Sequence, residues 1–225
     1  TGIENVGNKK IIRTSHSHYS SDCAIFAAGL YSDELAKLDN IKHDIRIIGF
    51  RGDYYNLKES AVSKVNALIY PVPNIELPFL GVHLTKTIEG GVEAGPNAVF
   101  SFKKEGYSIY SFSLVDTIKA LSFIGLWKMF IDYWKIGLNE YIRAFSKTLF
   151  LNSLQKLVPA LKRSELSRGK SGVRAQAIDK NGNLVDDFLI LEGKNSIHII
   201  NAPSPAATSC LSIADHVINK INNSV

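Results

Sequence analysis

The stretch from Gly172 to Ala214 constrains the fold more than any other part of the sequence. It contains Asn181-Gly182 between apolar segments, a pair typical of the tight turn of a β-hairpin. An apolar strand is expected over 196–200, and it ends at a polar turn over 201–208. The apolar residues that follow, between 211 and 221, are spaced for one face of a helix. The stretch therefore predicts a strand, a tight turn and a helix in succession.

The turn before this helix has two interpretations. Pro203 and Pro205 lack backbone donors, and the N–H groups of Ala206, Ala207 and Thr208 are expected to be free at the start of the helix. Free N–H groups and the positive end of the helix dipole favour an anionic or carbonyl-rich ligand. The alternative is a proline-stiffened turn that only caps an ordinary C-terminal helix.

The beginning of the chain indicates the edge of a nucleotide-binding layer. Strands are expected at Ile11-Ile12 and over 23–29, and the second ends in Ala-Ala-Gly before a helix that Ser32 would cap. Such a strand is typical of the last strand of a nucleotide-binding α/β layer. No G-x-G-x-x-G motif occurs in the 225 residues, and Gly90–Gly95 is a weak phosphate loop because it lies between strand-like segments. The layer is therefore predicted to be incomplete, in a sequence that starts at Thr1 inside a longer protein.

The middle of the chain is rich in strand-like segments separated by proline and glycine. Four are expected, at 45–55, 67–73, 80–85 and 92–102. Short strands in succession favour an antiparallel sheet over further βαβ units.

A helical section is predicted from 114 to 161, broken by Gly125 and Gly137 into two or three helices. It carries a broad apolar stripe that includes Leu126, Phe130, Tyr133 and Trp134. Such a stripe is typical of a helix face that packs into the core. The alternative is a membrane-facing surface, because basic residues accompany the stripe, namely Lys119, Lys128, Lys135, Arg143 and Lys147.

Charge and cysteine content exclude several classes of protein. The net charge is +5, but the basic residues are dispersed and lack interleaved aromatics, which argues against a nucleic-acid partner. Cys23 and Cys210 form no metal-binding pattern, so neither a metal site nor a disulfide framework is expected. The sequence shows no signal peptide and no apolar run long enough to span a bilayer. A reduced, cytoplasmic compartment is therefore the default expectation.

Seven blocks of the sequence resemble one enzyme family and occur in its order: GFRGDYY, LIYPVP, LGVHLT, GGVEAGPNAV, GVRAQA, NLVDDFLI and NAPSPAAT. They are similar to the L-2-hydroxyglutarate oxidase (dehydrogenase) family, which belongs to the FAD-dependent oxidoreductases related to D-amino acid and glycine oxidases. The resemblance runs from Cys23 to His216 and lacks the family's N-terminal FAD-binding βαβ unit. It therefore covers only the C-terminal part of such an enzyme, as a fragment, a split-gene product or a non-catalytic remnant.

The resemblance implies an α+β fold in three parts. Residues 1–44 would be a remnant of the FAD-binding domain, 45–170 a substrate-binding domain of antiparallel sheet followed by helices, and 171–225 the return to the FAD-binding domain. The FAD-binding part would be an incomplete Rossmann-like layer in which 23–29 joins 196–200.

The implied activity is FAD-dependent oxidation of L-2-hydroxyglutarate to 2-oxoglutarate, with a small dicarboxylate as substrate. The resemblance also implies a membrane quinone as electron acceptor, peripheral contact with the inner face of the membrane, and a separate polypeptide as one source of the missing FAD-binding unit. The cofactor-binding residues would be Ala28, Gly29, Gly172, Val173, Ala202, Pro203, Ser204, Pro205, Ala206, Ala207 and Thr208.

Four residues are predicted to form the substrate site, each with a structural alternative. His83 would accept the hydroxyl proton, although a lone strand histidine is more often a core residue. Arg174, behind Gly172, would bind the substrate carboxylate, or else pair with Asp186 or Asp187.

For the second carboxylate of a diacid the candidate is Arg51, and an ion pair with Asp53 is the alternative. Tyr70 would donate its hydroxyl to the substrate, or else pack in the sheet. Lys103 and Tyr107 are weaker candidates near the same site.

Overall fold

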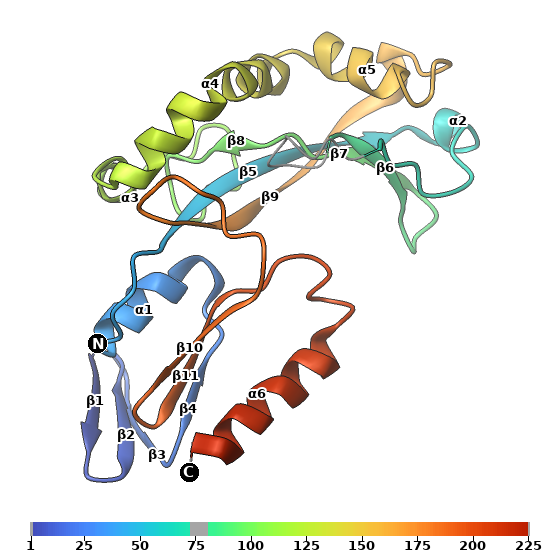
Figure 1. The fold of residues 1–225 in the computed structure, drawn as a ribbon. Helices are drawn as coiled ribbons and strands as arrows, with labels where there is room; N and C mark the ends of the chain where they lie inside the picture. Colours follow the sequence, from blue (N-terminus) through green and yellow to red (C-terminus); the bar gives the residue numbers. More distant parts are fainter. Residues whose placement is uncertain (1, 73–80, 225) are drawn as a thin grey trace. The chain divides into compact units, whose positions relative to one another are not determined.

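The computed structural model describes residues 2–72 and 81–224 and divides them into two compact units (Figure 1). The first unit comprises residues 1–47 and 175–225, and the second comprises residues 48–174. The predicted domain boundaries, at 44/45 and 170/171, lie within a few residues of these limits. Their assignment as cofactor and substrate domains stays a prediction.

The first unit contains two three-stranded sheets. Strands β1 (Gly2–Val6), β2 (Lys9–Arg13) and β3 (His18–Ser21) form an antiparallel meander. Sequence analysis found only the apolar part of β2, because β1 and β3 are short and mostly exposed and carry no clear alternation.

In the other sheet, β10 (Leu189–Gly193) pairs antiparallel with β11 (Ser196–Asn201), and β11 pairs parallel with β4 (Ala24–Phe26). Ser196 lies opposite Ala24 and His198 opposite Phe26. The prediction that the segments 23–29 and 196–200 join in one layer is therefore confirmed.

Short helices accompany this parallel pair. A 3-10 turn (η1, Gly29–Tyr31) leads into α1 (Ser32–Leu38). The predicted cap is off by one residue: Tyr31 is the N-cap of α1, and the Ser32 hydroxyl donates to the Gly29 carbonyl at 2.8 Å. The predicted C-terminal helix is α6 (Cys210–Ser224), which begins later than the proline turn suggested.

A buried ionic network joins three elements of the first unit. The Lys10 ammonium donates to Asp39 Oδ1 at 2.6 Å, and the two side chains are 0% and 1% exposed. Ser196 Oγ and His198 Nε2 contact Asp39 Oδ2 at 2.5 and 2.9 Å. Burial alone would raise the pKa of Asp39, but these hydrogen bonds hold it below its usual value. The network connects β2 and β11 to the residue that follows α1.

The second unit is built on a five-stranded sheet. Strands β6 (His83–Lys86), β7 (Val92–Gly95), β5 (Arg46–Leu57) and β8 (Val99–Phe100) lie in that order, and β9 (Leu166–Ile178) also pairs with β5. Strands β6 and β7 pair antiparallel, and so do β7 and β8 with β5, as predicted.

Two predicted strands differ from the structure. The segment 92–102 is divided into the two short strands β7 and β8. The segment 67–73 forms no strand within its described residues, where Ile69 makes an isolated bridge to Leu84. Pro73 and Leu80, at the ends of two predicted strands, lie outside the described residues. The predicted hairpin turn at Asn181-Gly182 is present, with Ile178 bridged to Leu184 across it.

Helices cover one face of this sheet (Figure 1). Apart from the short α2 (Glu59–Val62) and the 3-10 turn η2 (Arg163–Glu165), they are α3 (Leu114–Leu121), α4 (Ile124–Phe145) and α5 (Lys147–Gln155). The section forms three helices, as predicted, and the first break lies at 122–123, just before Gly125. The break at Gly137 was predicted wrongly, since this glycine lies inside α4, which is kinked at Tyr133 instead. Serine caps set two of the helix starts instead, because Ser113 and Ser146 accept hydrogen bonds from the Asp116 and Leu149 amides.

Replacing Asp39 should destabilise the first unit strongly. Asp39→Ala leaves Lys10 as a buried cation without its partner, and should lower the free energy of unfolding by about 3–5 kcal/mol. The measurement is hydrogen exchange of the β4 and β11 amides. Asp22→Ala, which removes an exposed partner of Lys9, is the matched control and should have little effect. Equal losses of protection in the two variants would contradict the role given to the network.

Candidate active site

The sheet of the second unit has two chemically different faces. Tyr55 of β5 packs against Phe150 of α5, with ring centroids 4.7 Å apart, so this side of β5 faces the helices. The same apolar core contains Val82, Leu84, Val92 and Ala94. Side chains alternate along a strand, and Tyr54, His83 and Glu93 therefore lie on the opposite face. We call this opposite face the helix-free face.

His83 lies on the helix-free face, and one of its ring nitrogens makes a hydrogen bond to the backbone. Its Nδ1 is 3.2 Å from the Gly81 carbonyl oxygen. A carbonyl only accepts hydrogen bonds, so Nδ1 is the donor in this contact, and in the neutral imidazole Nε2 is the nitrogen able to accept a proton. Tyr70 stacks on the imidazole with ring centroids 4.4 Å apart and an interplanar angle of 18°. The structure thus brings together two of the four predicted substrate residues.

Arg174 influences Tyr54, a side chain of the helix-free face, through its charge. Burial raises the pKa of Tyr54, nearby Glu93 and Tyr70 raise it further, and Arg174 lowers it. Glu93, Tyr70 and Arg174 are therefore each close enough to Tyr54 to influence it. Arg174 itself is exposed, near the end of the second unit on β9.

The helix side of β5 holds a second polar cluster, centred on Asp53. Arg51 Nε donates to Asp53 Oδ1 at 2.9 Å, and both side chains are less than a tenth exposed. Asn97 and Ser171 donate to the same carboxylate at 3.2 and 2.8 Å. Burial alone would raise the pKa of Asp53, but these donors and the Arg51 charge hold it below its usual range.

This geometry favours the structural alternative for Arg51. Two of its nitrogens contact Asp53, and Nη1 donates to the Ser108 carbonyl at 3.2 Å. Its role in binding a second carboxylate stays a prediction.

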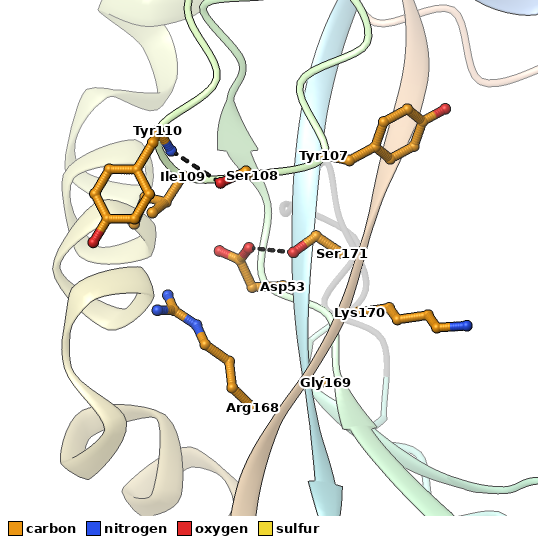
Figure 2. A pocket seen from close by; sticks show the side chains of 9 residues that line it. All are labelled: Asp53, Tyr107, Ser108, Ile109, Tyr110, Arg168, Gly169, Lys170 and Ser171. Atoms are coloured by element: carbon orange, nitrogen blue, oxygen red, sulfur yellow. Dashed lines mark hydrogen bonds between the residues drawn. The ribbon is translucent and has the colours of Figure 1, made fainter.

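A cavity of about 480 Å³ lies beside Asp53 (Figure 2). It is lined by Asp53, Tyr107, Ser108, Ile109, Tyr110, Arg168, Gly169, Lys170 and Ser171. Figure 2 shows the Asp53 carboxylate and the Ser171 hydroxyl turned toward each other. Of the two weaker candidates, Tyr107 lines this cavity, and Lys103 is exposed on the loop after β8.

The predicted cofactor residues fall in both units. Ala28, Gly29 and the turn 202–208 belong to the first unit, and Gly172 and Val173 to the second. The expectation of free N–H groups in the turn is wrong at two of three positions. The Ala206 amide donates to the Pro203 carbonyl at 2.9 Å, and the Thr208 amide donates to the Pro205 carbonyl at 3.1 Å. The turn folds on itself before α6 begins.

A sequence profile described as FAD dependent oxidoreductase matches residues 1–219. The chain belongs to this family of FAD-dependent oxidoreductases. Among its relatives, the L-2-hydroxyglutarate dehydrogenase of Indibacter alkaliphilus is 47% identical over 96% of the chain and 54% of the relative. The enzyme of the same name from Escherichia coli strain K12 is 40% identical over 98% of the chain and 53% of the relative. The chain spans about half the length of the relatives it matches.

Solved structures agree on the fold of this FAD-dependent oxidoreductase chain. The FAD-bound L-α-glycerophosphate oxidase of Mycoplasma pneumoniae matches 99% of the chain and 49% of its own length, with a TM-score of 0.69 and 19% identity. The FAD-bound glycerol-3-phosphate dehydrogenase of Bacillus halodurans matches with a TM-score of 0.53 and 14% identity, over 99% of the chain and 38% of its own length. The predicted α+β class with antiparallel sheet is confirmed.

The residues of the first unit fit one part of an FAD site. Because β4 and β11 are parallel, the chain leaves both strands at the same edge of the sheet, where open α/β sheets bind ligands. Gly29 adopts φ +52°, and the described residues leave open space where its Cβ would stand. Gly172, in the second unit, has the same open space. The fit does not extend to the pyrophosphate, since these 225 residues contain no G-x-G-x-x-G.

Sequence reasoning missed Tyr54 and Glu93. The alternation within Gly52-Asp53-Tyr54-Tyr55 was a usable signal for Tyr54, since one tyrosine of the pair must face away from the helices. Among the described residues, no group of histidine, cysteine and carboxylate side chains suits a metal ion, and no helix has the length and apolar character needed to cross a bilayer.

Asp53→Asn should destabilise the second unit in a pH-dependent manner. At neutral pH the loss should be about 3–5 kcal/mol, because Arg51 would lose its buried partner. The folded-state pKa of Asp53 is lowered, so the carboxylate stabilises the fold above its ordinary pKa and this contribution fades as the pH falls. The gap between the variant and the native protein should therefore narrow below about pH 4.

Urea unfolding followed by tryptophan fluorescence measures this gap, because both tryptophans, Trp127 and Trp134, lie in α4 of the same unit. The exposed Asp132→Asn is the control and should give a small, pH-independent difference. A gap for Asp53→Asn that stays constant down to pH 3 would disprove the assignment.

Proposed function

We propose that this chain is the substrate-binding part, together with one portion of the FAD-binding part, of an enzyme that oxidises L-2-hydroxyglutarate to 2-oxoglutarate. The observation that carries the proposal is the Tyr70–His83 stack on the helix-free face, with His83 Nε2 as the nitrogen able to accept a proton. The identity of 40–47% to L-2-hydroxyglutarate dehydrogenases over nearly the whole chain supports the choice of substrate.

His83 would act as the general base. A 2-hydroxy acid must lose the proton of its C2 hydroxyl as it is oxidised, and Nε2 is the imidazole atom able to accept that proton. The hydrogen bond from Nδ1 to the Gly81 carbonyl fixes the tautomer and stabilises the imidazolium that forms. FAD, when bound, supplies the two-electron acceptor for the hydrogen on C2.

Arg174 would bind the carboxylate next to the reacting carbon. A guanidinium presents two parallel donors to the two oxygens of a carboxylate, which a lysine does not. Tyr70 would donate its hydroxyl to the substrate while its ring limits the motion of His83. For Arg51 to bind the second carboxylate of a diacid, that carboxylate would have to compete with Asp53 and the Ser108 carbonyl, which the Arg51 donors hold.

The partner implied is a G-x-G-x-x-G dinucleotide-binding unit, in the same polypeptide or in a separate one. We propose that the residues at the carboxyl edge of β4 and β11 contact the flavin ring, and that the added unit binds the pyrophosphate. The competing hypothesis is a non-catalytic remnant, which would hold no FAD.

The test joins this chain to such a unit and measures bound FAD and the formation of 2-oxoglutarate with an artificial electron acceptor. The native protein should be yellow and active, and His83→Asn should keep its FAD but turn over about 10²–10⁴-fold more slowly. Asn219→Ala, an exposed change on α6, is the control. A colourless protein would favour the remnant, and near-native turnover by His83→Asn would exclude this base.

We also propose that the enzyme contacts a membrane through α4. Seven apolar side chains of α4 are spaced three or four residues apart and are each 45–71% exposed: Ile124, Trp127, Ile131, Trp134, Leu138, Ile142 and Phe145. The helix is kinked at Tyr133, so three of them precede the kink and four follow it. The predicted core stripe is only partly confirmed, since Leu126 is fully buried and Trp134 is 58% exposed.

The charge beside these apolar side chains favours an anionic lipid surface as their partner. Lys128 and Lys135 come directly after the two tryptophans, Trp127 and Trp134, in the sequence, and both lysines are exposed. Tryptophan with flanking lysine is typical of helices that lie in the interface of a bilayer. On the cytoplasmic face of such a membrane, a quinone would be the electron acceptor within reach.

Vesicle binding tests this surface. The tryptophan emission should shift to the blue with vesicles that contain phosphatidylglycerol, and less with pure phosphatidylcholine. The double variant Ile131→Ser/Leu138→Ser should bind about tenfold or more weakly, because each side chain loses its burial in lipid. Leu68→Ser, at a similarly exposed position outside α4, is the control. Equal binding by the two variants would exclude α4 as the contact.

A further inference from the structure

Strand register places Tyr54 in line with His83 across three strands. His83 of β6 lies opposite Gly95 of β7, and Ala94 lies opposite Tyr55 of β5. Gly95 is therefore adjacent to Tyr54, and the row His83, Gly95, Tyr54 crosses the helix-free face. Neighbouring strands are about 4.8 Å apart, so the two outer backbones are separated by about 10 Å. The residue between the imidazole and the phenol is a glycine, which places no side chain in the row.

The backbone around Tyr54 is shaped to hold its ring in one place. A Cβ on Gly95 would stand 3.0 Å from Tyr54 Cδ1 and 2.9 Å from the Asp53 carbonyl oxygen, so the tyrosine ring leans over β7. Gly95 also adopts φ +149°. On the β9 side, a Cβ on Gly169 would stand 3.1 Å from the Tyr54 carbonyl oxygen. The close approach of Gly95 to the ring limits the positions open to Tyr54, which lowers the entropy lost when it binds a ligand.

The hydrogen-bond donors around this row suit a carboxylate on a carbon that bears a hydroxyl, and Glu93 adds one negative charge nearby. Tyr70 stacks on His83, and Arg174 and Glu93 both act on Tyr54 electrostatically, so two phenols, a guanidinium and a carboxylate lie near the row. Phenol and guanidinium groups donate hydrogen bonds to carboxylate oxygens. His83 Nε2 supplies the acceptor that a hydroxyl needs.

We infer that Tyr54 is a substrate-binding residue whose hydroxyl donates to the C1 carboxylate of a 2-hydroxy acid, beside Arg174, while His83 receives the hydroxyl. This inference rests on the proposed function and adds a residue to it. Tyr55, next in sequence, faces the helices and has no such role.

The test uses the FAD-loaded protein that contains the dinucleotide-binding unit. Calorimetry measures the Kd of the product 2-oxoglutarate, and steady-state kinetics measure KM and kcat with L-2-hydroxyglutarate. Tyr54→Phe should weaken 2-oxoglutarate binding about 10–100-fold, as expected for one hydrogen bond to a charged group. It should raise KM more than it lowers kcat, and it should leave the unfolding temperature and the FAD content unchanged.

Tyr55→Phe is the matched control and should leave Kd and KM unchanged. Gly95→Ala is a second variant that keeps Tyr54 but displaces its ring, and it should also weaken 2-oxoglutarate binding. If the native protein binds 2-oxoglutarate and Tyr54→Phe changes the Kd by less than twofold, this inference alone is overturned. A native protein that binds neither acid overturns the proposed function and this inference with it.

Discussion

The alternation of side chains along β5 is the constraint on which the second unit depends. A strand has only two sides, so the packing of Tyr55 against Phe150 fixes Tyr54 on the opposite face. A shift of one residue in register would expose Tyr55 and bury the polar row. The hydrophobic core therefore does more than stabilise this unit, because it also determines which side chains can meet a substrate.

Two buried carboxylates support this arrangement, one in each unit. Asp53 fixes Arg51, Asn97 and Ser171, which come from separate segments of the second unit. Asp39 does the same for β2 and β11 in the first. A buried ion pair adds little net stability compared with apolar packing, but breaking one is costly. Both networks therefore act as strong constraints on which segments can pack together.

The sequence was sufficient to predict the layer that joins β4 to β11. The ends of both strands are marked by short local patterns, Ala-Ala-Gly after β4 and a proline-containing turn after β11. It was insufficient for the helix breaks, since Gly137 is tolerated within α4 and a serine sets the start of the next helix. The Arg51–Asp53 pair was predicted only as an alternative. Residues two apart on a strand share a face, but whether they form an ion pair depends on their burial, which the sequence does not show. Tyr54 was missed because its partners come from β6, β7 and β9, and register across strands cannot be read from spacing within one.

The most direct test of the account is a crystal structure of the FAD-loaded protein with 2-oxoglutarate bound. The account predicts the C1 carboxylate within hydrogen-bond distance of Arg174, on the helix-free face, with the C2 oxygen at His83 Nε2. A ligand seated in the cavity beside Asp53, on the helix side of the sheet, would contradict it.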